Sequence, residues 1–196
     1  MPLVVLGRRA SNRANLSAVL RLSSVPLDAS HRSCIRRASV DQQLIETYAA
    51  DAVKLRQSIE GLTPEELQAF PVPGTWSIQQ IVLHVMDSDL IGADRMKRVA
   101  VEPTMPTLLG YDETAFAQGL SYHDLDPQMA CDVFEKNRLL TAESLRRLPP
   151  SVFDRKGHHN EHGELTLAEF LASYVEHLNH HLKFIRQKRE LLGKPL

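Results

Sequence analysis

The chain has 196 residues and two cysteines, and its formal net charge is −1 with histidine counted as neutral. This length suits one domain with an ordinary hydrophobic core, and the near-zero charge argues against nucleic acid or an anionic membrane surface as a partner. No uninterrupted apolar stretch approaches the roughly 18 residues that a membrane span needs. Cys34 and Cys131 are too few and too far apart for a disulfide framework or a Cys-x-x-Cys metal site. We therefore expect a cytoplasmic protein in a reducing compartment.

Residues 1–39 differ in composition from the rest of the chain. They contain seven arginines and seven serines against a single acid, Asp28. This bias is typical of an organelle transit peptide, which would make import the alternative to a cytoplasmic location; it also fits a start codon placed too far upstream, with Val40 as the true start. Under either interpretation we expect residues 1–39 to be a basic, disordered extension and residues 40–196 to form the folded domain.

Four segments of the remaining chain carry the three- and four-residue apolar spacing of amphipathic helices. The helices are predicted at residues 41–62, from Thr75 or Ser77 to about Ala100, at 127–145 and at 166–193. The third starts after the Asp126-Pro127 pair, and the fourth opens with the capping-box pattern of Thr166 and Glu169.

Two connections between these helices stand out. Residues 102–126 contain two prolines and two glycines, so we expect a long connection with at most a short helix near residues 113–118. Connections of this length inside a compact domain are often functional. Residues 156–163 are polar and are predicted to be a loop. Because no segment shows a convincing strand pattern, the predicted architecture is an all-α four-helix bundle.

Three histidines on predicted helices form the outline of a metal site. Residues four apart on a helix lie on the same face, so His177 and His181 can direct both imidazoles at one ion. His84 lies on another apolar helical segment and could supply a third ligand. His180, three residues after His177, could replace His181 as its partner. Hydrogen-bonded or solvated imidazoles are the simpler interpretation of each histidine alone, but burying three of them among aliphatic side chains without a partner would cost several kcal/mol.

Several segments resemble the DinB/YfiT-like superfamily. The second predicted helix carries the stretch GTWSIQQIVLHVMDSD at residues 74–89, followed by Arg95 and Lys97. The last predicted helix opens with GELTLAEF at residues 163–170 and continues to HLNHH at residues 177–181. The Tyr111-Asp112-Glu113 segment of the long connection is also similar to a feature of YfiT-type members. The resemblance covers roughly residues 41–189.

This resemblance implies a metal-binding four-helix bundle, often a homodimer, whose ligands would be His84, His177 and His181 rather than His180. The superfamily includes thiol-dependent S-transferases such as the bacillithiol transferases. Three imidazoles suit zinc, nickel, iron or copper, and we expect a divalent ion, zinc or nickel.

The residues around the proposed ligands have alternative roles. Asp87 lies one turn after His84 and could accept an N–H from an imidazole on another helix, or it could be solvated or paired with Arg95. His158, His159 and His162 could overhang the pocket, but a plain loop is the preferred interpretation. Two tyrosines of the long connection, Tyr111 and Tyr122, are candidate substrate contacts. Trp76 is expected to be a packing anchor and Cys131 an unreactive core residue.

Three functions are compatible with an open three-histidine site. In the first, which we rank ahead, a low-molecular-weight thiol is deprotonated at the metal and attacks a small electrophile. The second is a metal-dependent hydrolase, for which Asp87, Asp89 and Glu176 are the acids with a claim to act as base. The third is a non-catalytic bundle that binds a small ligand or a stress signal and uses the metal as a structural strut. The expected partner is a small-molecule substrate.

Overall fold

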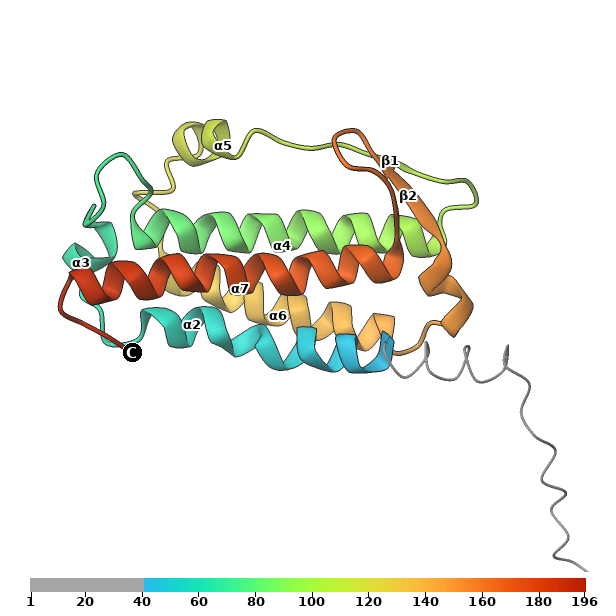
Figure 1. The fold of residues 1–196 in the computed structure, drawn as a ribbon, viewed down its shortest axis with the longest axis horizontal. Coiled ribbons are helices and arrows are strands. Elements are labelled where there is room, and N and C mark those ends of the chain that lie inside the picture. The colour runs from blue at the N-terminus through green and yellow to red at the C-terminus, as the bar shows by residue number, and fades with distance from the viewer. Residues whose placement is uncertain (1–40) are drawn as a thin grey trace, which may run out of the picture.

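The structure is a computed structural model that describes residues 41–196. The expectation for residues 1–39 lies outside the described residues. Within them, four long helices lie side by side along the long axis of the molecule (Figure 1). They are the helical stretch 41–50, which continues through η1 (Asp51–Val53) into α2 (Lys54–Ile59), and then α4 (Ile78–Val101), α6 (Pro127–Leu145) and α7 (Leu167–Leu191). The predicted four-helix bundle is confirmed.

The helix starts follow from local sequence. Ser77 accepts the backbone N–H of Gln80 while the Gln80 side chain accepts the N–H of Ser77, and Thr166 and Glu169 form the same reciprocal capping box. Asp126 caps α6 in front of Pro127. These boundaries agree with the prediction because capping chemistry is local. The first helix instead ends at Ile59, three residues before the predicted end.

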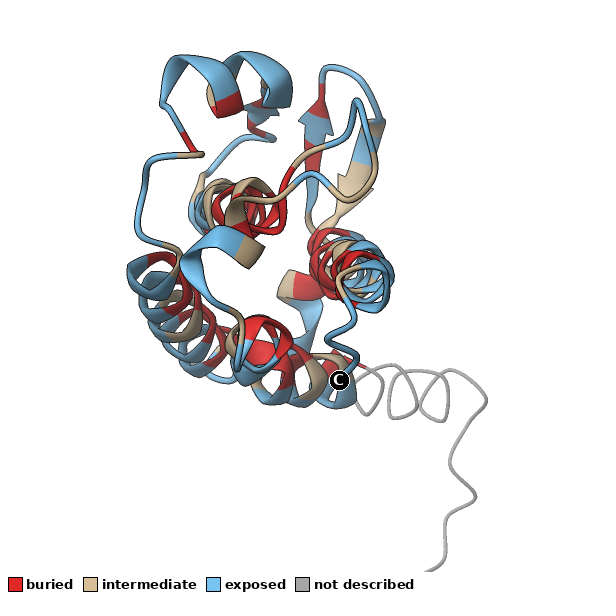
Figure 2. Cartoon of the chain, turned by 90° about the vertical axis from the view of Figure 1, so that its left-hand side faces the viewer, coloured by how far each residue is buried: buried red, intermediate tan, exposed pale blue. Residues whose placement is uncertain are grey.

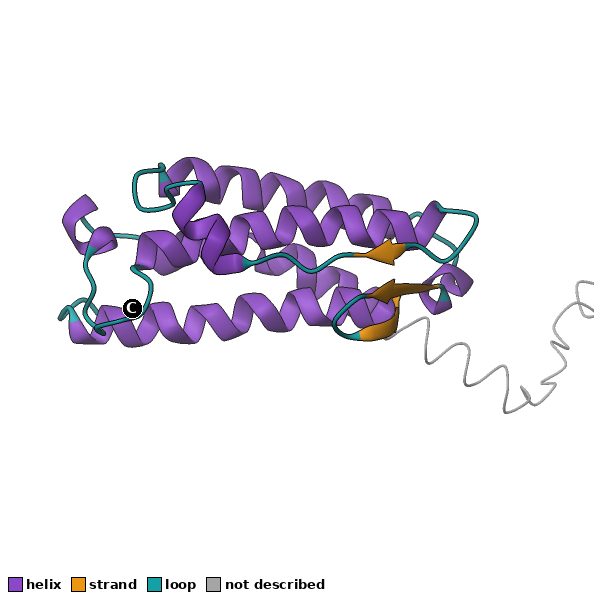
Figure 3. Cartoon of the chain, turned by 90° about the horizontal axis from the view of Figure 1, so that it is seen from above, coloured by secondary structure: helices purple, strands orange, loops and turns teal. Residues whose placement is uncertain are grey.

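The shorter elements connect the long helices. They are α3 (Pro64–Gln68), β1 (Thr107–Leu108), α5 (Glu113–Gly119), η2 (Pro150–Asp154), β2 (Lys156–His159) and β3 (Gly163–Thr166). The connection that carries β1 and α5 runs along α4 (Figures 1 and 3). The short helix in this connection confirms the prediction for residues 113–118.

A small sheet lies at one end of the bundle, where the sequence predicted only loops. β2 pairs with β3 in antiparallel fashion, with Lys156 opposite Thr166, and β1 pairs with β2 in parallel, with Thr107 opposite His158. The expectation of no strands was wrong because β2 lacks β-branched residues and its pairing depends on distant contacts. A methyl group on Gly157 would lie 2.7 Å from Val99 Cγ2, so β2 approaches α4 more closely than any other residue would allow.

Figure 2 shows that the buried residues lie mainly on the sides of the helices that face the middle of the bundle. The buried apolar residues form two clusters: one includes Ile78, Val82 and Leu178, and the other includes Tyr48, Met96 and Leu171. None of the described helices is long and apolar enough to cross a membrane.

A buried ion pair joins α4 to α6 between these clusters. Arg138 Nε donates to Asp89 Oδ1 at 2.9 Å, and both side chains are at most 2% exposed. Asn137 and Tyr48 donate to the same carboxylate, and Arg138 also donates to the carbonyl of Tyr174. Burial nevertheless raises the pKa of Asp89 above its ordinary value. Because Asp89 serves this interhelical network, it is not available as a catalytic base.

Candidate metal centre

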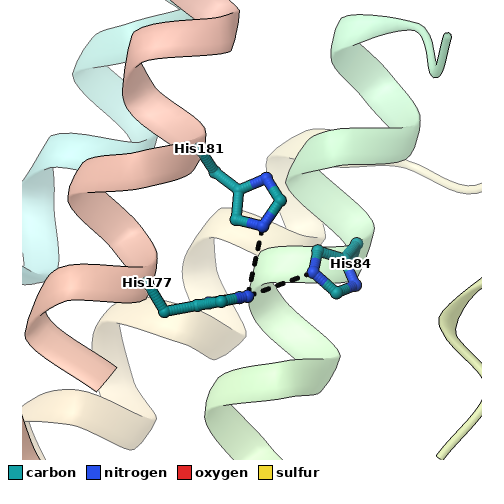
Figure 4. A group of neighbouring side chains, drawn as sticks. All are labelled: His84, His177 and His181. Atoms are coloured by element: carbon teal, nitrogen blue, oxygen red, sulfur yellow. Dashed lines mark hydrogen bonds between the residues drawn. The ribbon is translucent and has the colours of Figure 1, made fainter. Parts of the chain in front are cut away.

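The three predicted histidines meet between α4 and α7. His177 Nε2 lies 3.2 Å from His84 Nε2 and 3.1 Å from His181 Nε2 (Figure 4). The ligand atoms of the three residues all lie within 4.8 Å of one another. His84 is fully buried, and the other two are partly buried. His180 is exposed and stacks edge-on against Phe184, so it does not take part in this cluster.

The spacing of the three nitrogens fits a shared cation. Two nitrogens held about 2.0–2.1 Å from a zinc-like ion in tetrahedral geometry lie about 3.3–3.4 Å apart, which is close to the two distances from His177. Each imidazole nitrogen offers either one hydrogen or one lone pair, so His177 Nε2 cannot form a hydrogen bond with both His84 Nε2 and His181 Nε2 at once. The donor set could therefore hold one divalent ion.

The local environment keeps these imidazoles neutral. Burial, reinforced by the neighbouring imidazoles, lowers the pKa of His84 to about 3, that of His177 to about 4 and that of His181 to about 3. At neutral pH the rings therefore carry no additional proton, and a metal ion would not have to displace one.

Two aromatic residues surround His84. The ring of Trp76 packs against it with centroids 5.0 Å apart, which agrees with the predicted role of Trp76 as a packing anchor. Tyr111 Oη lies 3.5 Å from His84 Nδ1, the nitrogen that faces away from the cluster. The Asp87 carboxylate accepts a hydrogen bond from the Tyr122 hydroxyl. The proposed role of Asp87 as an acceptor for an imidazole N–H stays a prediction.

A pocket of about 510 Å³ adjoins the cluster on the side of His177. Its walls come from α4, α7, the long connection and the β2–β3 hairpin. They consist of Ser88, Arg95, Gly110, Tyr111, Glu113, His159, Glu161, His162, Leu165, Phe170, Ser173, Tyr174 and His177. This volume lies within the range of about 300–1,000 Å³ that is usual for small-molecule sites.

Glu113 is the acid nearest to the three imidazoles. Its Oε2 lies 3.9 Å from His84 Nε2, at the start of α5, which Asp112 caps. Burial, together with the charges of Glu161 and Asp112, raises the pKa of Glu113. The Tyr111-Asp112-Glu113 segment stands out in the sequence, but no role for Glu113 could be predicted, because nothing local shows that the connection folds back over α4.

The hairpin places further polar groups in the pocket. His159, Glu161 and His162 lie close enough that their ligand atoms are within 4.8 Å of one another, and the rings of His159 and His162 stack with centroids 4.7 Å apart. The preferred interpretation of this segment as a plain loop was therefore wrong. Across the pocket, Arg95 donates to Tyr174 Oη at 2.9 Å and to the carbonyl of Leu109, which fixes a positive charge in the wall.

Cys131 is unsuited to nucleophilic chemistry. It is buried in the core, and burial raises the pKa of its thiol to about 12. The predicted role of an unreactive core residue agrees with this environment.

A four-helix bundle with a buried cluster of three imidazoles beside a polar pocket defines a helical protein with a candidate metal centre. The chain belongs to the DinB superfamily, whose family profile matches residues 47–185 and so includes all three histidines. The resemblance to DinB/YfiT-like proteins is confirmed.

Comparison with known proteins identifies relatives of similar length. YfiT of Bacillus subtilis is 29% identical over 152 residues, which cover 77% of this chain and 83% of YfiT. A protein of Bacillus licheniformis is 28% identical over 158 residues, covering 78% of this chain and 89% of its own. The names of both propose a metal-dependent hydrolase. The solved structure of Bacillus subtilis YfiT, described as a four-helix bundle of unusual topology, matches with a TM-score of 0.73 at 24% identity and covers 85% of this chain and 90% of that chain.

Proposed function

We propose that the protein is a metal-dependent enzyme in which His84, His177 and His181 hold one divalent ion, zinc or nickel. The short distances from His177 Nε2 to His84 Nε2 and His181 Nε2, 3.2 and 3.1 Å, carry this proposal. An ion held by three imidazoles supplies an open coordination position and lowers the pKa of a water or a thiol that occupies it. The metal-dependent names of the relatives support the same chemistry.

Glu113 is the proposed general base. Its carboxylate lies beside His84 and lines the pocket, and its raised pKa brings it nearer to the pH at which proton transfer is efficient. It would take a proton from the nucleophile and return it to the leaving group. Tyr111 would hold the ring of His84 through Nδ1, and Arg95 would bind an anionic part of the substrate.

Hydrolysis of a small ester or amide is the reaction we favour. A general base beside the three histidines is needed most when the nucleophile is water, because the proton of water is harder to remove than that of a thiol. Because Glu113 lies so close to His84, we rank hydrolysis ahead of thiol-dependent transfer, which is the reverse of the order expected from the sequence. The names of the relatives agree with hydrolysis.

Thiol-dependent transfer is the second candidate. The pocket of about 510 Å³ is much larger than water requires and has room for a thiol and an electrophile together. Since Cys131 is buried and its thiol has a raised pKa, the nucleophilic sulfur would have to come from a cellular thiol.

To test this proposal, turnover by the metal-loaded protein is measured with a panel of esters and amides, and separately with a panel of cellular thiols and a chlorinated aromatic electrophile. For hydrolysis, Glu113→Gln should lower kcat by about 10²- to 10⁴-fold while the protein keeps its metal. Glu176→Gln is the matched control, because Glu176 is an exposed acid on α7 beside His177 and does not line the pocket. Turnover that needs a thiol would favour transfer, and an absence of turnover in both panels would favour a non-catalytic binding protein.

A further inference from the structure

A second cavity lies beside the three imidazoles, and its lining shares no residue with the polar pocket. It has a volume of about 240 Å³ and is formed by the start of α4, the preceding loop and the C-terminal half of α7. Its lining consists of Val72, Thr75, Trp76, Ile81, His181, Phe184, Gln187 and Lys188. The walls are largely apolar, and the volume suits a molecule smaller than the usual drug-sized ligand.

Lys188 provides the positive charge in this lining, and it is only 4% exposed. Its Nζ donates to Thr75 Oγ1 at 2.6 Å, while the Thr75 hydroxyl donates to the carbonyl of Val72 at 2.8 Å. An ammonium group has three N–H donors, so this bond uses one of them. Among the described residues, no ion pair involves Lys188.

The neighbouring residue shows how the fold satisfies a buried cation elsewhere. Arg189 is 6% exposed, and it donates to the backbone carbonyls of Ser58, Glu60 and Lys194. Those bonds tie α7 to the end of the first helix and explain the burial of Arg189. Lys188 has a single hydroxyl instead. Burying an ammonium group without a carboxylate is costly, and burial lowers the pKa of Lys188 accordingly.

We propose that this cavity is a binding site for a small apolar molecule that carries one carboxylate. The carboxylate would accept hydrogen bonds from the remaining N–H groups of Lys188. The hydrocarbon part would pack against Trp76, Ile81 and Phe184. This site does not depend on the proposed enzymatic function, because none of the groups that recognise the ligand holds the metal.

The chain contains a natural reporter for this site. Trp76 is its single tryptophan and lines the cavity, so its fluorescence reports a ligand there. We would titrate the metal-loaded protein with hexanoate and with 1-hexanol, which have six carbon atoms each but differ in charge. Hexanoate should bind at least about tenfold more tightly than the alcohol, because a hydrogen bond to a charged group strengthens binding by about this factor or more.

Two lysine variants assign the effect to its source. Lys188→Met should abolish the preference for hexanoate, whereas Lys183→Met, which removes an exposed lysine five residues earlier on α7, should retain it. A preference for hexanoate that survives Lys188→Met but disappears with EDTA would place the carboxylate on the metal and overturn the proposal. Equal affinity for both ligands in the wild-type protein would also overturn it.

A third variant keeps the test decisive if Lys188→Met does not fold. Phe184 is 41% exposed, so Phe184→Ala should leave the fold intact while removing one apolar wall. It should weaken hexanoate and 1-hexanol by a similar factor. Unchanged affinity for both ligands would show that they bind outside this cavity.

Discussion

At the scale of single residues, the three imidazoles can be tested one at a time. Replacing His84, His177 or His181 by Ala should lower the affinity for zinc at least about 100-fold. Loss of a residue that only hydrogen-bonds to a metal ligand lowers metal affinity about 10- to 100-fold, and loss of the ligand itself should lower it further. Metal content after dialysis is the measurement. His180→Ala is the matched control, because His180 is exposed on the same helix and should leave binding unchanged. One zinc per chain after loss of His84 would contradict the site.

The same residues make the metal-free protein sensitive to acid. Their pKa values are about 3 to 4 in the folded chain, against about 6.5 for free histidine. Above pH 6.5 the imidazoles are neutral in both states and add no pH dependence. As the pH falls from about 6.5 towards 4, the unfolded chain binds protons that the folded chain does not, so stability decreases.

Urea unfolding in EDTA between pH 8 and pH 5 measures this decrease. Replacing the fully buried His84 by Gln should reduce the slope by roughly 1 kcal/mol per pH unit, while His180→Gln should not change it. A wild-type unfolding free energy that is constant between pH 7 and pH 5 would contradict the neutral, buried state of the cluster.

The clustering of the three imidazoles could be predicted from sequence, while the residues around them could not. His84, His177 and His181 lie on helices whose periodicity and caps are local, and the family resemblance distinguished His181 from His180. Glu113 and the hairpin histidines reach the pocket only because the connection and β2 fold back over α4. That arrangement depends on contacts between residues far apart in sequence, such as the hydrogen bond from Gly110 N–H to Asn160.

At the scale of elements, the close approach of α4 and α7 depends on Gly92. A methyl group at this position would overlap the ring of Tyr174, which is buried and whose hydroxyl accepts a hydrogen bond from Arg95. Gly92→Ala should therefore destabilise the protein by about 1–3 kcal/mol, although alanine is the better helix former. Urea unfolding is the measurement.

Gly119 is the matched control for Gly92. It lies at the end of α5, and a methyl group there would have no neighbour within 4 Å. Gly119→Ala should leave stability unchanged or raise it by up to about 1 kcal/mol. A neutral or stabilising Gly92→Ala would show that α7 and Tyr174 can move away from α4, and the distances at the imidazole cluster would then not be fixed by this contact.

At the scale of the whole molecule, the helix α7 contributes residues to two different cavities. On α7, His177 faces the polar pocket, while His181 and Lys188 line the apolar cavity. The imidazole cluster therefore lies between a charged compartment and an apolar one. A ligand in either compartment would lie beside one residue of the cluster, His177 in the polar pocket or His181 in the apolar cavity.

We expect the fold to require only part of the chain. A chain that starts at Val40 should melt at the same temperature as the full chain, because the composition of residues 1–39 cannot support a packed core. A chain that starts at Ala49 is the control: it lacks Ile45 and Tyr48, which are at most 2% exposed. Loss of these two side chains should cost several kcal/mol, which corresponds to a fall of about 10 °C or more. A comparable fall on removal of residues 1–39 alone would show that they contribute to the folded structure.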